Sequence, residues 1–210
     1  MLIRTLPSDT IGLPPPPPGG FGYGGDDGGN GRGGARRASF TAVVVVLAAT
    51  AMVFAALTSA YLFLRRPAAS MPLPDILWLN TAVLLVSSAC LEAALWCLKS
   101  GRRAAFNLWW SAGAICGLLF LAGQGLAWQQ LLDAGVFVSG NPAAAFFYLL
   151  TATHAVHLLG GVAVLVWIAV RALRFELGPG RRTAAGAGAL FWHFLDGLWV
   201  YLLALFSFWG

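Results

Sequence analysis

The sequence predicts an all-α fold, a polytopic membrane bundle of five transmembrane helices within residues 38–210. Three observations support this prediction. The composition is 59% hydrophobic and only 10% charged, with a mean hydropathy of +0.75, whereas a soluble domain of this size needs far more charge to keep its surface hydrated. The apolar residues form five long blocks, and basic residues stand between the blocks, as is typical of membrane proteins.

Each apolar block is long enough to cross a bilayer. The first runs without a charge from Ala38 to Leu64, and at roughly 1.5 Å per residue it exceeds the ~30 Å hydrocarbon core. The second has one interior charge, Glu92. The predicted spans are residues 38–64, 75–98, 104–132, 143–170 and 184–209. Near the span ends, where aromatic side chains meet headgroups, we expect Trp78, Trp109, Trp110, Trp128 and Trp209.

Residues 1–37 form a tail of low complexity. A run of prolines from Pro14 to Pro18 precedes a glycine-rich stretch; proline favours extended polyproline II, whereas glycine favours coil. We therefore expect a disordered cytoplasmic tail without packed structure. Recognition of the proline run by a partner is the alternative.

The basic residues predict the orientation in the membrane. With the amino terminus in the cytoplasm, the outer segments carry only Arg65 and Arg66, and an inner excess of positive charge is the usual bias. We therefore expect the amino terminus inside and the carboxyl terminus outside. Because no single basic patch forms, nucleic acid is not an expected partner. The inner basic residues are Arg32, Arg36, Arg37, Lys99, Arg102, Arg103, Arg171, Arg174, Arg181 and Arg182, of which the last four are candidates for contact with phospholipid headgroups.

Polar side chains inside the apolar blocks are candidates for function, because hydrocarbon solvates them poorly. His154 and His157 are three residues apart in the fourth block, and His193 and Asp196 are three apart in the fifth, so each pair shares a helix face. Glu92 lies near the inner end of its block, where its carboxylate can reach water or Lys99. The other candidates are Asn80, Gln124, Thr151, Trp192 and Trp199.

Three kinds of chemistry fit the histidines. A haem needs imidazoles from two helices at matching depth, and His157 and His193 differ in depth by roughly 6 Å. A metal ion could use the histidines with Asp196, but no motif such as H-E-x-x-H is present. In the third interpretation the histidines and Asp196 hydrogen-bond across the fourth and fifth helices and lock the bundle together. The residues themselves favour this third, structural interpretation.

Two stretches resemble a known family. Residues 147–161, FYLLTATHAVHLLGG, are similar to the LTxxHxxHhxxG motif of cytochrome c oxidase subunit III, a subunit of haem-copper terminal oxidases. Residues 191–199, FWHFLDGLW, are similar to the YWHFhDxhW motif of the same family. The resemblance covers about residues 40–209 and includes weaker matches at Leu79, Asn80, Thr81, Ser87, Ser88, Gln124 and Trp128.

The resemblance implies the short, five-helix bacterial form of this subunit, located in the plasma membrane. Such a subunit is an accessory part of an enzyme complex that reduces O2 and pumps protons. It implies no catalytic residue, no haem and no metal in this chain, because haem and copper lie in partner subunits. It also implies main contact with subunit I, association with subunit II, and phospholipids held between the helices.

Two positions depart from the family pattern. Thr50 and Gly186 stand where the family often has glutamates, so we expect this chain to stabilise the catalytic subunit rather than to carry protons. Two other functions remain open from the sequence. One is a haem-binding membrane electron-transfer protein, and the other is the homologous accessory subunit of a quinol oxidase or nitric oxide reductase.

Overall fold

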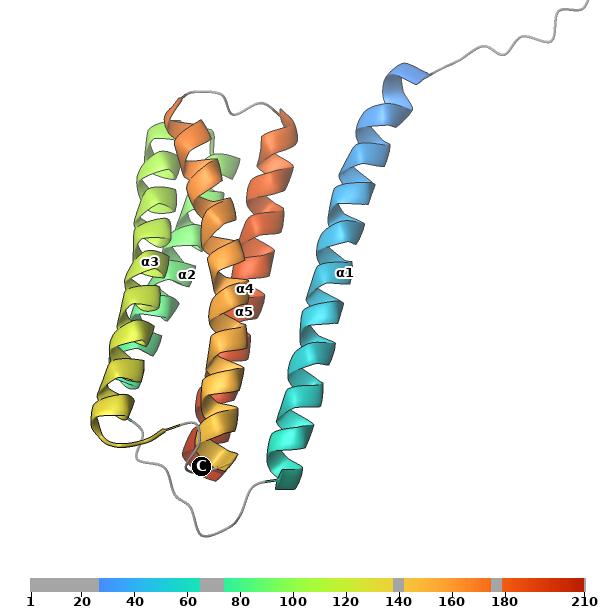
Figure 1. Cartoon of the computed structure of the whole chain (residues 1–210). Helices are drawn as coiled ribbons and strands as arrows, with labels where there is room; N and C mark the ends of the chain where they lie inside the picture. Colours follow the sequence, from blue (N-terminus) through green and yellow to red (C-terminus); the bar gives the residue numbers. More distant parts are fainter. Residues whose placement is uncertain (1–26, 65–73, 138–141, 175–178, 210) are drawn as a thin grey trace, which may run out of the picture.

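The protein folds into five long helices, and the residues that the structure describes contain no strand. The computed structural model describes residues 27–64, 74–137, 142–174 and 179–209, with side chains for residues 40–64, 74–137, 144–174 and 183–208. The predicted all-α fold is therefore confirmed. The helices are α1 Asp27–Leu64, α2 Ile76–Lys99, α3 Arg103–Asp133, α4 Pro142–Leu173 and α5 Pro179–Trp209 (Figure 1).

All five helices are long and apolar enough to cross a membrane, as predicted. At roughly 1.5 Å per residue, even the shortest of these segments exceeds the ~30 Å hydrocarbon core. Their bounds agree with the apolar blocks of the sequence to within a few residues. The membrane-spanning segments are Phe40–Leu64, Ile76–Lys99, Arg103–Asp133, Ala144–Leu173 and Thr183–Phe208.

Helix α1 begins earlier than the sequence analysis predicts. It starts at Asp27, so residues 27–37, which the composition assigns to a disordered tail, are helical. Each residue added to an existing helix gains a hydrogen bond without a new nucleus, which allows a glycine-rich stretch to continue the apolar segment. The rest of the predicted tail, including the proline run, lies outside the described residues.

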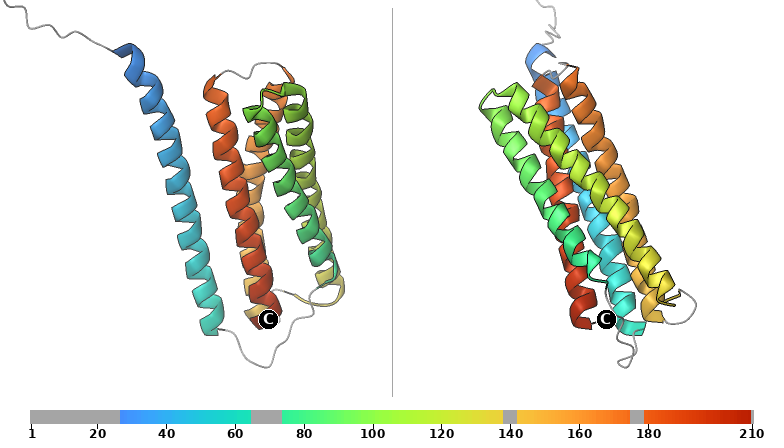
Figure 2. Two further views of the ribbon diagram at one scale, coloured as in Figure 1. Left: turned by 180° about the vertical axis from the view of Figure 1, so that it is seen from behind. Right: turned by 90° about the vertical axis from the view of Figure 1, so that its left-hand side faces the viewer.

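Helices α2 to α5 form a four-helix bundle, and α1 lies beside it. Each bundle helix contacts the next one along the chain, and α2 also contacts α5, which closes the ring. Within the described residues, α1 contacts α4 and α5 but neither α2 nor α3, and Figures 1 and 2 show it at the side of the bundle. Helix α1 therefore does not cover the surface of α2.

Helices α2 and α3 make the most extensive helix–helix contact, and a tight turn joins them. Gly101 in this turn has a φ of 74°, a conformation that glycine adopts without strain. The N–H of Arg102 donates to the carbonyl oxygen of Cys97 at 2.9 Å and so satisfies a carbonyl at the end of α2. Further along, Ser87 Oγ donates to the carbonyl oxygen of Gly113 at 2.8 Å, a backbone approach that the missing side chain of Gly113 permits.

Large aromatic side chains fill the core of the bundle. Trp110 corrects one prediction, because its side chain is fully buried instead of lying among the headgroups. Its indole N–H donates to the carbonyl oxygen of Leu165 at 3.0 Å, which supplies the partner that a buried indole needs. The largest fully buried aromatic side chains of the bundle are Trp110, Trp192, Trp199, Phe106, Phe120 and Phe147.

Helix α1 attaches to the bundle along one stripe. Thr50, Phe54, Thr58 and Tyr61 recur every three or four residues, so they lie on one face of α1, and each is buried. The Phe54 ring lies against the rings of two α4 histidines, and the Tyr61 ring contacts one phenylalanine of α4 and one of α5. The opposite face of α1 is apolar and exposed, as a lipid-facing surface requires.

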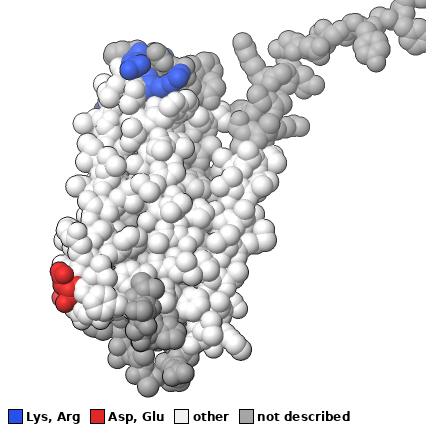
Figure 3. Space-filling model, viewed as in Figure 1, with Lys and Arg blue, Asp and Glu red and all other residues white. Residues whose placement is uncertain are grey.

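Charged side chains gather at the ends of the bundle. Figure 3 shows Lys and Arg at one end and acidic side chains toward the other, with an uncharged band between them on this face. The basic end is where α2 stops at Lys99 and α3 starts at Arg103, and Arg171 lies there in the last turn of α4. This distribution is typical of a protein that crosses a bilayer.

Candidate functional site

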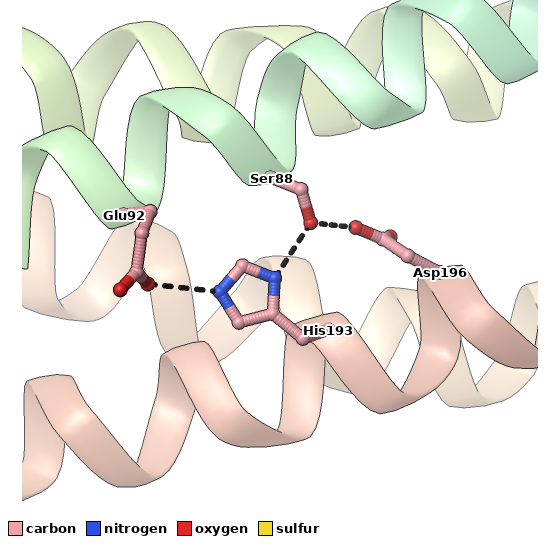
Figure 4. A network of polar contacts seen from close by, with 4 residues as sticks. All are labelled: Ser88, Glu92, His193 and Asp196. Atoms are coloured by element: carbon pink, nitrogen blue, oxygen red, sulfur yellow. Dashed lines mark hydrogen bonds and ion pairs between the residues drawn. The ribbon is translucent and has the colours of Figure 1, made fainter.

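A network of four polar side chains joins α2 to α5 (Figure 4). Ser88 Oγ lies 2.7 Å from His193 Nδ1 and donates to a carboxylate oxygen of Asp196. His193 Nε2 lies 3.4 Å from an oxygen of Glu92. Ser88 and Glu92 are four residues apart on α2, and His193 and Asp196 are three apart on α5, so helical periodicity brings the two pairs face to face.

Ser88 has one hydroxyl proton and two polar neighbours, His193 and Asp196. When Ser88 donates this proton to Asp196, its oxygen is left to accept from His193, which requires the tautomer with a proton on Nδ1. The contact between Nε2 and Glu92 is then favourable in two states. Either an imidazolium faces a carboxylate, or a neutral imidazole accepts a hydrogen bond from a carboxylic acid.

The network extends from the core of the bundle to its outer surface. Asp196 is 4% exposed, whereas the side chains of His193 and Glu92 are 36% and 67% exposed. The position of Glu92 in the sequence predicts water or Lys99 as its partner, but in the structure its carboxylate pairs with His193. The sequence lacks a local signal for this pairing, because the two residues lie on different helices.

A second set of bonds holds α2 against its neighbours. The indole N–H of Trp199 donates to Thr81 Oγ1 at 2.9 Å, and Thr81 in turn donates to the carbonyl oxygen of Leu77. On the other side of α2, Asn80 Nδ2 donates to the carbonyl oxygen of Phe120 in α3 at 3.0 Å. Asn80 and Trp199 are thus interhelical hydrogen-bonding residues, and both were candidates from the sequence.

Trp192 and Gln124 are buried but lack such bonds. Neither the indole nitrogen of Trp192 nor the side-chain amide of Gln124 has a hydrogen-bond partner among the described residues. Trp192 packs closely on two glycines of neighbouring helices, because a Cβ on Gly117 would lie 2.6 Å from the indole and one on Gly161 would lie 3.2 Å from it. Trp192 therefore contributes to the bundle through close packing, at a point where α3, α4 and α5 meet.

His154 is enclosed by aromatic rings. Its ring centroid lies 5.3 Å from that of Trp199, and 6.3 Å from those of Phe54 and Phe120. The side chain is fully buried, and neither ring nitrogen has a hydrogen-bond partner among the described residues. Sequence reasoning missed this environment because the three rings come from three different helices.

The other polar residues of α4 bond mainly within their own helix. His157 Nδ1 lies 2.8 Å from the carbonyl oxygen of Thr153, and Thr151 Oγ1 donates to the carbonyl oxygen of Phe147 at 2.7 Å. Thr151 also accepts from the indole N–H of Trp128 in α3 at 3.2 Å. The hydrogen bonds of His193 and Asp196 therefore lead to α2, not to α4 as the sequence analysis expects.

The geometry of His193 bears on the haem and metal interpretations. Both of its ring nitrogens face side chains, Ser88 on one side and Glu92 on the other, so in this arrangement neither is available to an iron. No group of three or more His, Cys, Asp or Glu within the described ranges is arranged to hold a metal ion. What the arrangement does chemically is to join α2 to α5 through four polar side chains.

The four candidate lipid-binding arginines, and the two positions that depart from the family pattern, differ in their environments. The Arg171 guanidinium lies 5.0 Å from the ring centroid of Trp167, and Arg174 is exposed. Arg181 and Arg182 belong to the first turns of α5, and their side chains lie outside the described set. Thr50 is buried at the contact of α1 with the bundle, whereas Gly186 is exposed, and a Cβ added to it would have nothing within 4 Å.

The family model and the similar proteins found by comparison all point to the same family. The family described as cytochrome c oxidase subunit III matches residues 68–210. A "probable cytochrome c oxidase subunit 3" of Nocardia farcinica is 29% identical over 164 residues, which are 75% of this chain and 81% of that protein. The "probable cytochrome c oxidase subunit 3" of Mycobacterium leprae is 28% identical with the same coverage, and the "cytochrome c oxidase subunit 3" of Corynebacterium diphtheriae is 27% identical, over 58% of this chain and 60% of that one. A five-helix membrane fold and a family match across most of the chain agree, and the chain belongs to the cytochrome c oxidase subunit III family.

Proposed function

We propose that this chain is the accessory, cofactor-free subunit III of a bacterial haem-copper respiratory oxidase, and that it stabilises the catalytic subunit and its lipids. Electron transfer, O2 reduction and proton pumping then belong to the partner subunits, which hold the haem and copper. The observation that carries the proposal is the family match over residues 68–210. The polar network supports it, because it joins α2 to α5.

Stabilisation of a partner requires a rigid surface. Ser88 links to two residues of α5, and the bond from Trp199 to Thr81 is a third contact between α5 and α2. Bonds of this kind inside membranes contribute on the order of 0.6–2 kcal/mol each. We assign His154 and His157 to the same structural role, because their rings pack against Phe54 of α1.

Phospholipids are the second class of partner that we propose. The inner loop between α4 and α5 would bring Arg171, Arg174, Arg181 and Arg182 to one membrane surface, where each basic residue gains about 1 kcal/mol from anionic headgroups. This assignment uses the orientation that the basic residues favour, with the amino terminus in the cytoplasm and the carboxyl terminus outside. The Nocardia and Mycobacterium relatives are bacterial, which supports a bacterial plasma membrane as the location.

Purification followed by spectroscopy distinguishes an accessory subunit from a haem-binding electron-transfer protein. The chain is purified alone and together with its membrane partners, and visible absorption spectra are recorded for both. We expect the isolated chain to be colourless and to co-purify with a subunit that contains haem and copper. Stoichiometric haem in the isolated chain would contradict the accessory role.

A substitution tests the structural role of the network. Asp196→Ala removes the buried acceptor of Ser88, so we expect the chain to dissociate more readily from the complex in native gels, before the redox spectra of the catalytic subunit change. Thr153→Ala is the matched control, because among the described residues this hydroxyl bonds only the carbonyl oxygen of Leu149 in its own helix. Intact assembly with altered spectra in Asp196→Ala would argue against the structural role.

A further inference from the structure

Glu92 places a carboxylate on the outer surface of the bundle at the depth of the hydrocarbon. It lies seven residues before Lys99, the end of α2, which is roughly 10 Å along the helix axis. Helix α2 has 24 residues and is thus roughly 36 Å long, only slightly longer than the ~30 Å hydrocarbon core. The side chain of Glu92 is 67% exposed, and the side chain of its partner His193 is 36% exposed.

Only one oxygen of the Glu92 carboxylate has a partner among the described residues, and the other is open to a partner from outside the chain. Ionisable groups inside membranes almost always face a protein interior, a water-filled cavity or an opposite charge, because lipid tails offer no hydrogen bond. Figure 4 shows one oxygen of Glu92 directed to His193 and the other directed away from it. Away from the helix ends, Glu92 is the only exposed carboxylate among the described residues, and α1 makes no contact with α2.

The shape of the same surface suits a closely packed helix. Gly186 and Gly197 lie seven residues before and four residues after His193, so all three share one face of α5. Both glycines are exposed, and a Cβ at either position would have nothing within 4 Å. Small residues on a transmembrane helix allow another backbone to approach closely. On α2, Ala89 and Trp96 flank Glu92 and are exposed as well.

We infer that this surface, the α2–α5 seam formed by Ala89, Glu92, Trp96, Gly186, His193 and Gly197, is where a transmembrane helix of the catalytic subunit packs, with a hydrogen-bond donor level with Glu92. The inference rests on the proposed function and identifies the surface of this chain that contacts the catalytic subunit. An acyl chain has no donor to offer a carboxylate, whereas an Arg, Lys, Trp or Asn side chain on a helix does. The partner is therefore a helix with small or aliphatic side chains along most of its length and a polar side chain at the depth of Glu92.

Photo-cross-linking in the assembled oxidase tests the location. A photoreactive amino acid is placed at Trp96 in the seam and, as the control, at Leu119, a 56% exposed residue of α3, which is not one of the two helices that form the seam. We expect cross-links to the catalytic subunit from position 96 and only lipid adducts from position 119. Protein cross-links from position 119 with only lipid adducts from position 96 would overturn the seam. Failure of the chain to assemble with any oxidase subunit would instead contradict the proposed function.

Substitution of Glu92 tests the chemistry. Truncating one side of a desolvated charged pair raises the dissociation rate strongly, so we expect Glu92→Leu to leave the complex at least tenfold faster than wild type on dilution in detergent. Glu92→Gln keeps a hydrogen-bond acceptor and should dissociate at an intermediate rate. Asp133→Asn is the matched control, an exposed carboxylate at the end of α3, and should behave as wild type. Unchanged dissociation of Glu92→Leu, in a subunit of wild-type thermal stability, would refute the inference.

Discussion

His154 is the residue at which four helices meet. It belongs to α4, and its ring packs against Phe54 of α1, Phe120 of α3 and Trp199 of α5. Because its ring nitrogens have no hydrogen-bond partner among the described residues, shape is the property that this side chain contributes. The packing at position 154 therefore requires a flat ring with about the volume of an imidazole.

Two substitutions at His154 separate shape from polarity. His154→Ala removes the ring and leaves a cavity among three aromatic side chains, which should cost about 2 kcal/mol or more. His154→Phe keeps a flat ring and should stay within roughly 1.5 kcal/mol of the wild type. Thermal unfolding in detergent, followed by tryptophan fluorescence, measures both. Equal losses for the two variants would show that a ring nitrogen has a partner in the folded protein.

At the residue scale, the sequence predicts the polar residues better than their partners. Helical spacing predicts correctly that His193 and Asp196 share a face. It cannot say which neighbour that face meets, because this depends on the rotation of α5 against α2. The partner Ser88 follows only once the closed ring of helices is known.

At the scale of helices, glycines of α3 set how closely the bundle packs. A Cβ on Gly117 would lie 2.6 Å from the Trp192 indole and 3.4 Å from Val162, so α3 approaches α5 and α4 where it has no side chain. Trp192 is fully buried, so its indole cannot move without displacing its neighbours. Gly125 lies on the same helix with nothing within 4 Å of an added Cβ.

These two glycines predict opposite outcomes for the same substitution. Gly117→Ala overpacks the contact with Trp192 and should destabilise the bundle by about 1–3 kcal/mol. Gly125→Ala meets open space and removes the low helix propensity of glycine, so stability should be unchanged or rise by up to about 1 kcal/mol. Melting temperatures of the two variants in one detergent give the comparison. Similar melting temperatures would mean that Trp192 adjusts at little cost.

The helices themselves could be predicted because hydropathy is a local property. Length and charge spacing place five spans to within a few residues of those observed. The start of α1 at Asp27 could not be predicted in this way, because composition there favours coil while the helix behind it favours continuation. Trp110 is a similar case, since closeness to a span end does not reveal the acceptor at Leu165.

For the whole molecule, charge is separated along the bundle axis. Lys99, Arg103 and Arg171 lie at the end where α2 and α4 stop and α3 starts. Asp133 closes α3 at the opposite end. Positive residues stay on the cytoplasmic side during insertion, so this asymmetry predicts that the turn between α2 and α3 faces the cytoplasm.

Cysteine labelling tests this orientation. The native cysteines, Cys90, Cys97 and Cys116, are first replaced by alanine, and single cysteines are then introduced at Ser100 in the inner turn and at Ala134 beyond α3, both exposed in the structure. A maleimide that cannot cross membranes is applied to intact spheroplasts and to inverted vesicles. We expect Ala134→Cys to react in spheroplasts and Ser100→Cys to react in inverted vesicles.

The control for this labelling lies in the middle of a span. Met52 of α1 is 67% exposed on a face that should contact lipid, so Met52→Cys should react in neither preparation, because the thiolate that attacks maleimide does not form in hydrocarbon. Labelling of Met52→Cys would mean that this face of α1 lines water rather than lipid. The reverse pattern at Ser100 and Ala134 would place the amino terminus outside, and the basic end of the bundle could then not meet the anionic lipids of the cytoplasmic leaflet.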